Sequence, residues 1–174
     1  MGGELSGEEW RDAGRLRDLY GGEARFLRAD LSGVPLADSR VVVASSAAAY
    51  QMVVHLEGAL GEAHRVLRED GVLVLSVPHP LYELLDLETG EFRWSYFDTG
   101  RREITIDEEY ESVLVAFDRT VADLHNALVD AGFEVRRLLE TKHREAREND
   151  PADGDLPDLL WTVPRSVRFW AVAR

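Results

Sequence analysis

The chain has 174 residues, of which 45% are hydrophobic and 30% charged, a composition typical of one soluble globular domain. Its net charge of -13 argues against nucleic acid or an anionic membrane as partner, because either would repel it at long range. No apolar run is long enough to span a bilayer, and the absence of cysteine excludes disulfides, thiolate metal sites and a cysteine nucleophile.

The first segments predict a helix and a short strand. In "SGEEWRDAGRLRDLYGG", Ser6 and Glu9 have capping-box spacing, and apolar residues recur on one helical face as far as Gly21. The stretch 24–30, "ARFLRAD", is expected to be a strand that leads into a loop rich in turn formers. The start "MGGELSGEEW" lacks the basic and apolar regions of a secretory signal, so we expect a cytoplasmic protein.

Residues 41–77 predict a strand, a helix and a second strand. The run "VVVASS" at 41–46 is typical of a strand buried on both faces of a parallel sheet. Residues 50–69 carry apolar side chains at helical spacing, and Asp70-Gly71 turns the chain into a second buried strand, "VLVLSV". Such a unit is expected to form a right-handed parallel crossover.

The rest of the chain predicts an excursion and a return to the sheet. Residues 81–116 are interpreted as a substrate-side insertion or lid, in which 91–98 and 101–107 alternate like the strands of a hairpin. A helix is expected from Thr120 to Gly132 and a strand at 133–140. Residues 143–164 predict a mobile acidic loop, and "SVRFWAVAR" a final strand. The order favours a single α/β domain over 1–174, with an open sheet and helices on both faces.

Candidate ligand-binding residues follow from this order, because ligands of open α/β sheets bind beyond the carboxyl ends of the strands. A carboxylate at a helix start can accept hydrogen bonds from a vicinal diol, and one after a neighbouring strand can accept from an exocyclic amine. Glu4 and Asp30 stand at such places and together would suit a nucleoside. The other residues just past the expected strands are Leu31, Ser45, Ser46 and His79, the last between two prolines.

Five segments, taken in order, resemble the class I S-adenosylmethionine-dependent methyltransferases of the small-molecule, type 11 kind. They are "GELS" with its helix, "FLRADLSGVPLADSRVVVASSAAAY", "LGEAHRVLREDGVLVLSVPHP", "RTVADLHNALVDAGFEVRRLLE" and "VPRSVRFWAVAR". The most specific part matches a family pattern Glu-x-x-Arg-Val-Leu-x-x-Gly-Gly from Glu62 onward, with Asp70 in place of the first glycine. The resemblance implies a Rossmann-like, mostly parallel sheet with helices on both faces and an antiparallel C-terminal strand.

The resemblance also implies roles for single residues, with S-adenosylmethionine as cofactor. Glu4 and Leu5 would hold the ribose, Asp30 and the backbone of Leu31 would read the adenine, and Ser45 and Ser46 would line the cofactor cleft. His79 would face the substrate as a contact or proton acceptor. Apart from the resemblance, aromatic residues of the excursion, Tyr82 and Tyr96 among them, could form a wall for an apolar or cationic substrate or could equally fill the core of a small hairpin. Catalysis in this family is largely alignment of the acceptor with the methyl group, so that a dedicated base is optional.

The chain departs from the family at its start. The family begins with a strand and a Glu/Asp-x-Gly-x-Gly-x-Gly loop, and neither is found here. We therefore expect a truncated or degenerate domain with weak or no cofactor binding by this chain, and a homodimer or a replacement strand could fill the gap.

Three functions stay open on these grounds. The first is methyl transfer to a small-molecule acceptor, and the second is a non-catalytic, degenerate domain that binds a nucleoside or another protein chain. A nicotinamide-dependent oxidoreductase is the third, and the missing Gly-x-Gly-x-x-Gly loop counts against it. The histidines show no metal-ligand spacing, so no metal is predicted.

Overall fold

The computed structural model describes residues 15, 18–21, 23, 28–86, 88–105, 113–142 and 162–174. Most of the predicted helix at 6–20 and of the strand at 24–30 lies outside them, as do Glu4, Leu5 and residues 143–161 of the predicted acidic loop. The elements from β1 onward are β1 (Val41–Ala47), the 3-10 helix η1 (Ala49–Met52), α2 (Leu56–Val66), β2 (Leu67–Pro78), α3 (Pro80–Glu83), β3 (Gly100–Thr105), β4 (Val113–Asp118), α4 (Val121–Asp130), β5 (Phe133–Lys142) and β6 (Pro164–Ala173).

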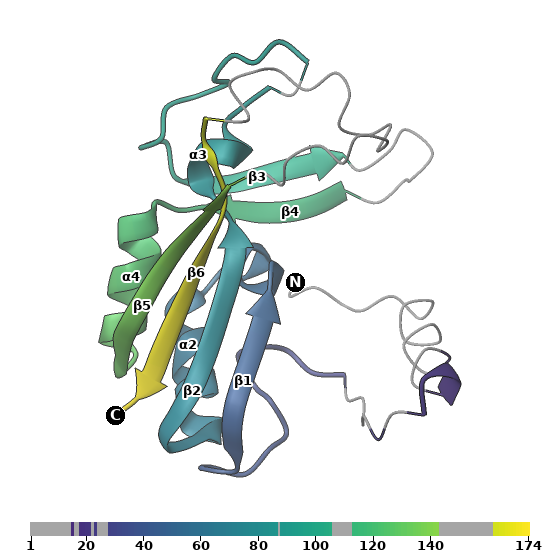
Figure 1. The fold of residues 1–174 in the computed structure, drawn as a ribbon, viewed down its shortest axis with the longest axis vertical. Helices are drawn as coiled ribbons and strands as arrows, with labels where there is room; N and C mark the ends of the chain where they lie inside the picture. Colours follow the sequence, from purple (N-terminus) through teal and green to yellow (C-terminus); the bar gives the residue numbers. More distant parts are fainter. Residues whose placement is uncertain are drawn as a thin grey trace.

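Four strands form the main sheet, in the order β1-β2-β6-β5 (Figure 1). β1 pairs in parallel with β2, as the predicted strand-helix-strand unit requires. β6 is antiparallel to both of its neighbours, so β1, β2 and β5 run in one direction and only the C-terminal strand runs against them. The predicted fold class, a mostly parallel sheet with an antiparallel last strand, is confirmed.

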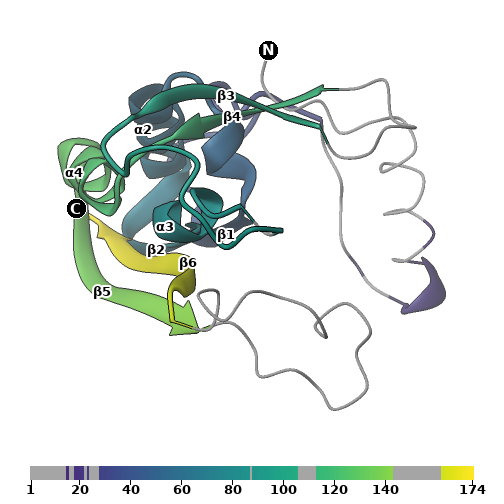
Figure 2. The same ribbon diagram turned by 90° about the horizontal axis from the view of Figure 1, so that it is seen from above.

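The two longer helices, α2 and α4, cover one face of this sheet (Figure 2). Helix α2 buries a stripe at helical spacing that begins at Leu56 and ends at Val66. Helix α4 begins with a complete capping box between Thr120 and Asp123, as predicted, and buries Leu124 and Leu128. Helices were expected on both faces, whereas both longer helices in the described part of the chain lie on the same one.

The sheet strands show the alternation that a half-covered sheet requires. Along β6, the predicted inward residues Val167, Phe169 and Ala171 are fully buried, which confirms the pattern read from the sequence. On the opposite face Trp170 stays 48% exposed.

The prediction that β1 is buried on both faces is wrong. Val42 is 49% and Val43 58% exposed. β1 is an edge strand within the described residues, and none of the described helices covers the face on which Val43 lies, so its apolar side chains remain accessible.

Two other predictions need correction. The described part of the predicted hairpin strand 101–107, residues 101–105, pairs with β4 and not with 91–98. Residues 91–98 form turns and a bridge from Phe92 to Leu85. The helix predicted over 50–69 is interrupted after η1, because Val53 has extended backbone angles and α2 begins only at Leu56. It also ends earlier than predicted, at Val66, and β2 begins at the next residue. The guanidinium of Arg119 donates to the carbonyls of Tyr50 and Val53 at the break.

Candidate functional site

A small pocket lies beyond the carboxyl end of β2, where the sequence places the substrate side. Its walls are the last residues of β2, helix α3, the hairpin β3–β4 and the first turns of α4, and its polar lining includes Tyr96, Asp98 and Arg102. The open volume is about 30 Å³, which holds about one water molecule. In this conformation the pocket is therefore nearly closed.

Arg102 closes the pocket from the hairpin side. Its Nε lies 3.0 Å from both carboxylate oxygens of Asp118, and its Nη2 pairs with Glu83 of α3. The guanidinium also lies 5.5 Å from the ring of Trp94. These side chains are only 18–21% exposed, so the three charges join the hairpin to α3 in a largely desolvated setting.

Arg119 joins the end of the hairpin to the segment after β1. It donates to the carbonyls of Val53 at 2.5 Å, Val54 at 3.3 Å and Tyr50 at 3.4 Å. Burial lowers the pKa of this guanidinium from its ordinary value. No carboxylate of the described residues hydrogen-bonds it, so Arg119 brings a positive charge to the wall of the pocket.

His79 caps α3 and is only 2% exposed. Its Nδ1 accepts a hydrogen bond from the Leu81 N–H at 3.1 Å, so the ring proton resides on Nε2, which donates to Glu140 Oε1 at 2.9 Å. Both ring nitrogens are thus engaged. Pro78 and Pro80 line the pocket, and the imidazole between them does not.

The two predicted tyrosines are placed differently from each other. Tyr96 lines the pocket, and its hydroxyl accepts a hydrogen bond from the Val121 N–H at the start of α4, at 2.9 Å. Tyr82 does not line the pocket, and its ring lies 5.3 Å from the guanidinium of Arg165. Of the three residues predicted on the substrate side, the structure brings only Tyr96 to the pocket.

On the predicted cofactor side, Asp30 is an exposed carboxylate at a turn. Its Oδ1 accepts hydrogen bonds from the side chain of Ser32 at 2.5 Å and from its backbone N–H at 2.7 Å, and these bonds lower the pKa of Asp30. Its Oδ2 has no hydrogen-bond partner among the described residues and is free to accept one. Leu31 is half-buried and packs against the core under the sheet.

Ser45 and Ser46 point to opposite faces of β1. Ser46 lies on the same face of β1 as Ala44, which packs against the core. Its buried Oγ has no hydrogen-bond partner within the part of the chain that the structure describes. Ser45 is exposed on the other face. A buried hydroxyl without a partner is costly, so this position of β1 is one where a partner group would stabilise the fold.

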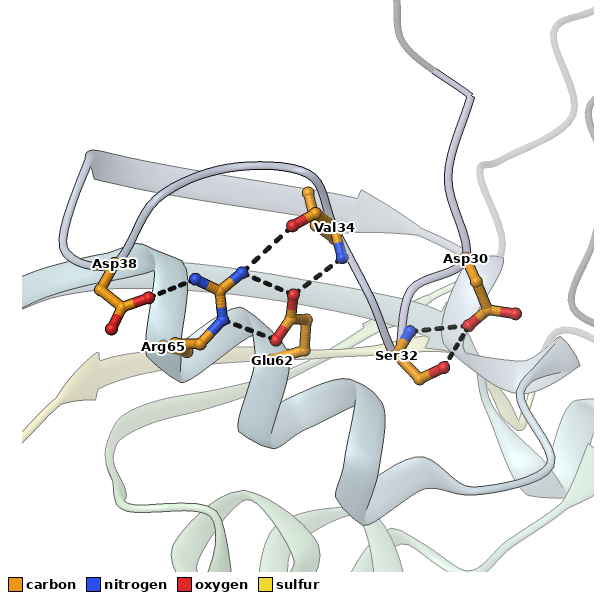
Figure 3. A network of polar contacts seen from close by, with 6 residues as sticks. All are labelled: Asp30, Ser32, Val34, Asp38, Glu62 and Arg65. Atoms are coloured by element: carbon orange, nitrogen blue, oxygen red, sulfur yellow. Dashed lines mark hydrogen bonds and ion pairs between the residues drawn. The ribbon is translucent and has the colours of Figure 1, made fainter.

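The loop that carries Asp30 is fastened to α2 by Glu62 and Arg65 (Figure 3). Glu62 Oε1 accepts from the Val34 N–H at 2.8 Å, and Arg65 donates to Glu62 at 2.7 and 2.8 Å and to the Val34 carbonyl at 3.1 Å. Arg65 also pairs with Asp38. Hydrogen bonding from Arg65 lowers the pKa of Glu62, which keeps the carboxylate ionised. The Glu-x-x-Arg pattern in the sequence thus fixes the loop that carries Asp30 to α2.

Sequence reasoning did not single out Glu83, Arg102 or Arg119. The available signal was their place beside apolar strand segments, with Arg102 within "RREIT" and Arg119 directly before the capping threonine. Which carboxylate or carbonyl each arginine meets depends on the packing of the hairpin against α3 and η1, which no local pattern encodes.

The comparisons with known proteins point to one family. Residues 5–75 match a family model described as a methyltransferase domain. An S-adenosylmethionine-dependent methyltransferase from Mesorhizobium loti superposes with a TM-score of 0.72 at 24% identity, over 97% of this chain and 77% of that one. One from Methanosarcina mazei gives 0.70 at 19% identity, over 98% and 79%.

The fold is that of a class I S-adenosylmethionine-dependent methyltransferase. This confirms the resemblance seen in the sequence, and the solved structures that it matches are described as S-adenosylmethionine-dependent. A methyltransferase from Burkholderia thailandensis, solved with 1,6-didemethyltoxoflavin and S-adenosylhomocysteine, has a TM-score of 0.56 at 16% identity, over 95% of this chain and 56% of that one. A comparison with curated protein sequences finds no match.

The matched segment contains the predicted cofactor side of the methyltransferase fold, Asp30, Leu31, Ser45 and Ser46. None of the helices in the described ranges combines the length and the apolar character needed to cross a membrane. Nor do the described residues bring together three or more histidine or carboxylate side chains that could hold a metal ion.

Proposed function

We propose that this chain binds S-adenosylmethionine beside β1 and supports transfer of its methyl group to a small molecule at the pocket beyond β2. The proposal rests on one observation: the carboxyl ends of β1 and β2 lie at the same edge of the sheet, because the two strands are parallel neighbours. The pocket lies at this edge. A methyl donor at one strand end and an acceptor at the next would be adjacent.

The residues on the cofactor side fit an adenosyl ligand. Asp30 has an ionised carboxylate whose Oδ2 has no hydrogen-bond partner among the described residues, which suits an exocyclic amine. Ser46 has a hydroxyl that likewise lacks a partner in the described ranges. The Glu62–Arg65 network holds the Asp30 loop in place before a ligand arrives, which lowers the ordering cost of binding. Glu4 and Leu5 complete this proposed set and lie outside the described residues.

The cofactor would supply an electrophilic methyl group, and the chain's task would be to bind and align the acceptor. Tyr96 and Arg119 supply polar contacts on the pocket wall, and the prolines that flank His79 supply apolar ones. We assign His79 to positioning, because both of its ring nitrogens are engaged and its bonds hold the start of α3 against β5. The acceptor is proposed to be a small molecule, since a net charge of -13 disfavours nucleic acid.

One observation favours a second candidate, a non-catalytic binding module. The pocket holds only about 30 Å³, and Arg102 ties its hairpin wall to α3. An acceptor could enter only if this wall moved. A chain in which it never opens would bind a nucleoside without transferring anything.

Calorimetry and ligand-observed NMR with S-adenosylhomocysteine test the proposal. We expect weak binding, with a Kd of about 0.1–1 mM, and a loss of at least about fivefold in Asp30→Asn, which removes the anionic acceptor. Asp86→Asn is the matched control, because Asp86 also accepts two hydrogen bonds on its Oδ1, from the backbone N–H groups of Glu88 and Thr89, but lies in the excursion after β2.

Equal affinity in Asp30→Asn and in the parent chain would remove Asp30 from the site. No binding at several millimolar ligand would sink the cofactor proposal. Binding by the parent chain with no opening of the hairpin on addition of acceptors would favour the binding module.

A further inference from the structure

One positive charge in the wall of the pocket beyond β2 is unmatched. The charged side chains that line this pocket are Glu83, Asp98, Arg102, Asp118 and Arg119. Arg102 is bonded to both Glu83 and Asp118, and Asp98 lies on an exposed turn, where it accepts from a backbone N–H. Arg119 forms no ion pair with any of the described residues, so its charge remains available to an anion.

The guanidinium of Arg119 also keeps donor capacity. Its Nη2 is held by the Val53 carbonyl at 2.5 Å, whereas the bonds of Nη1 to the carbonyls of Tyr50 and Phe117 are long, at 3.4 and 3.5 Å. Its Nε–H forms no hydrogen bond with the part of the chain that the structure describes. Carbonyl dipoles therefore hold this side chain in place without neutralising it.

The surroundings of Arg119 differ in charge on its two sides. Arg119 also lines an open hollow outside the pocket, whose wall carries Glu57, Asp123 and Asp130. Burial lowers the pKa of Arg119 more than the distant charges of Glu57 and Asp123 raise it. An anion is repelled from the hollow by these carboxylates, and on the pocket side the nearby carboxylates of Glu83 and Asp118 are already paired with an arginine. The pocket is therefore the side from which an anion can reach Arg119.

Two neutral side chains of the same pocket also have protons to donate. The Tyr96 hydroxyl accepts from the Val121 N–H at 2.9 Å, and its own proton has no acceptor among the described residues. The carboxamide of Gln51, in η1, lines the pocket and forms no hydrogen bond within the described ranges. Val121 lies two residues after Arg119, and Gln51 follows Tyr50, whose carbonyl Arg119 contacts. The three donors therefore gather where η1, the end of β4 and the start of α4 meet.

We propose that the methyl acceptor is a small organic acid whose carboxylate binds Arg119, Tyr96 and Gln51. A carboxylate accepts on both oxygens and carries no proton, so it complements one cation and two neutral donors. The charge-assisted bond to Arg119 contributes most of the preference for an anion. That this acid is a methyl acceptor rests on the proposed function, whereas the anion site itself does not require methyl transfer.

The three donors lie outside the strands that must move before an acceptor can enter. Tyr96 precedes β3, Arg119 follows β4 and Gln51 belongs to η1. The closed pocket holds only about 30 Å³, so a ligand enters when the hairpin releases its contacts with α3. Arg119 remains held by the Val53 carbonyl when this happens, which keeps the donor set in place.

Ligand-observed NMR with benzoate and benzamide tests the site, because the two probes share a ring and differ in charge. Titrations of the full chain are run at about 0.15 M salt, which screens the net charge of -13, with and without excess S-adenosylhomocysteine. We expect benzoate to bind with a Kd of about 1–10 mM and at least about fivefold more tightly than benzamide. No binding of benzoate up to about 50 mM in either condition overturns the proposal, as does equal affinity for the two probes.

Gln51→Glu places a competing carboxylate beside Arg119 without removing any hydrogen bond between side chains of the described residues. It should weaken benzoate by at least about tenfold and change benzamide by less than about threefold. The matched control is Asn126→Asp, which adds the same charge at an exposed residue of the outer hollow and should leave benzoate within about twofold. If both variants weaken benzoate equally, the probe senses net charge and not this site.

Replacing Arg119 separates its charge from its structural bonds. Arg119→Lys keeps the cation and should retain the preference for benzoate over benzamide, whereas Arg119→Met should lose it. A preference that survives in a folded Arg119→Met chain refutes the assignment. Binding of S-adenosylhomocysteine is measured on the same samples. A chain that binds benzoate but not S-adenosylhomocysteine refutes the proposed function and leaves the anion site standing, and one that binds S-adenosylhomocysteine with no preference for benzoate does the reverse.

Discussion

At the scale of single residues, the placement of His79 illustrates the difference between being near a site and lining it. The residue follows β2 at the edge where ligands of such sheets bind, as the sequence implied. Its ring, however, turns inward and joins the Leu81 N–H to Glu140. The flanking prolines, which have no side-chain hydrogen-bonding groups, are the ones that reach the pocket.

Replacing this histidine should therefore affect stability. His79→Ala leaves the Leu81 N–H without its acceptor and opens a cavity in a buried site, so we expect a loss of about 2–4 kcal/mol in the free energy of unfolding, measured in urea. His55→Ala is the control, because His55 is exposed and precedes α2 without a side-chain capping bond. It should change the stability by less than about 0.5 kcal/mol. A His79→Ala chain as stable as the parent would show that these hydrogen bonds do not hold α3 in place.

Asp30 and Ser46 were predicted to be site residues from their position after expected strands, which local patterns of apolar residues indicate. In the structure Ser46 lies inside β1, and most of the strand expected before Asp30 is outside the described residues. The network around Arg102 could not be found in this way. Its partners Glu83 and Asp118 are 19 and 16 residues away in sequence, and only the packing of the hairpin brings them together.

At the scale of elements, predictions succeeded where one periodic pattern decides the outcome. The stripes of α2 and α4 and the alternation of β6 are such patterns, and each is reproduced in the structure. The predictions failed where strand pairing or burial depends on another segment of the chain. The stretch 91–98 alternates well enough for a strand, but 113–118 offers a more β-branched partner to β3. The valines of β1 match a buried strand, yet their exposure depends on which other segments cover them.

The hairpin β3–β4 depends on one arginine for its attachment to α3. In Arg102→Ala, Glu83 and Asp118 lose the cation between them and repel each other in a largely desolvated setting. We expect amide hydrogen exchange in 100–105 and 113–118 to accelerate by about tenfold or more, while exchange in β2 is unchanged, because the hairpin opens locally without global unfolding.

The neighbouring arginine provides a matched control. Arg101 pairs with Glu103 at the surface, where both side chains are more than half exposed, so Arg101→Ala should leave exchange in the hairpin within about twofold of the parent. If both variants accelerate exchange equally, the hairpin is held by its own strand pairing and not by the ion pairs with α3.

At the scale of the whole molecule, the structure combines a strongly acidic surface with a sheet that is covered by described helices on one face only. The core lies between the sheet and the pair α2–α4, and the opposite face keeps Trp170 and Val43 accessible. The excess of carboxylates limits self-association through like-charge repulsion.

The net charge of -13 also makes the stability of the chain depend on salt. Folding brings the carboxylates closer together, and their mutual repulsion exceeds the attraction within the ion pairs, most of which are exposed and contribute little. We expect 0.5 M NaCl to raise the Tm by about 2–5 °C in calorimetry. Most of this gain should be reached by about 0.2 M, because the Debye length has fallen below about 8 Å at that concentration. Sodium sulfate at equal ionic strength separates screening from ion exclusion, because screening alone predicts the same gain in both salts. Repeating the scans at two protein concentrations removes any contribution from dimers. A Tm that falls with salt would mean that the networks of Arg65 and Arg102 outweigh the repulsion of the whole surface.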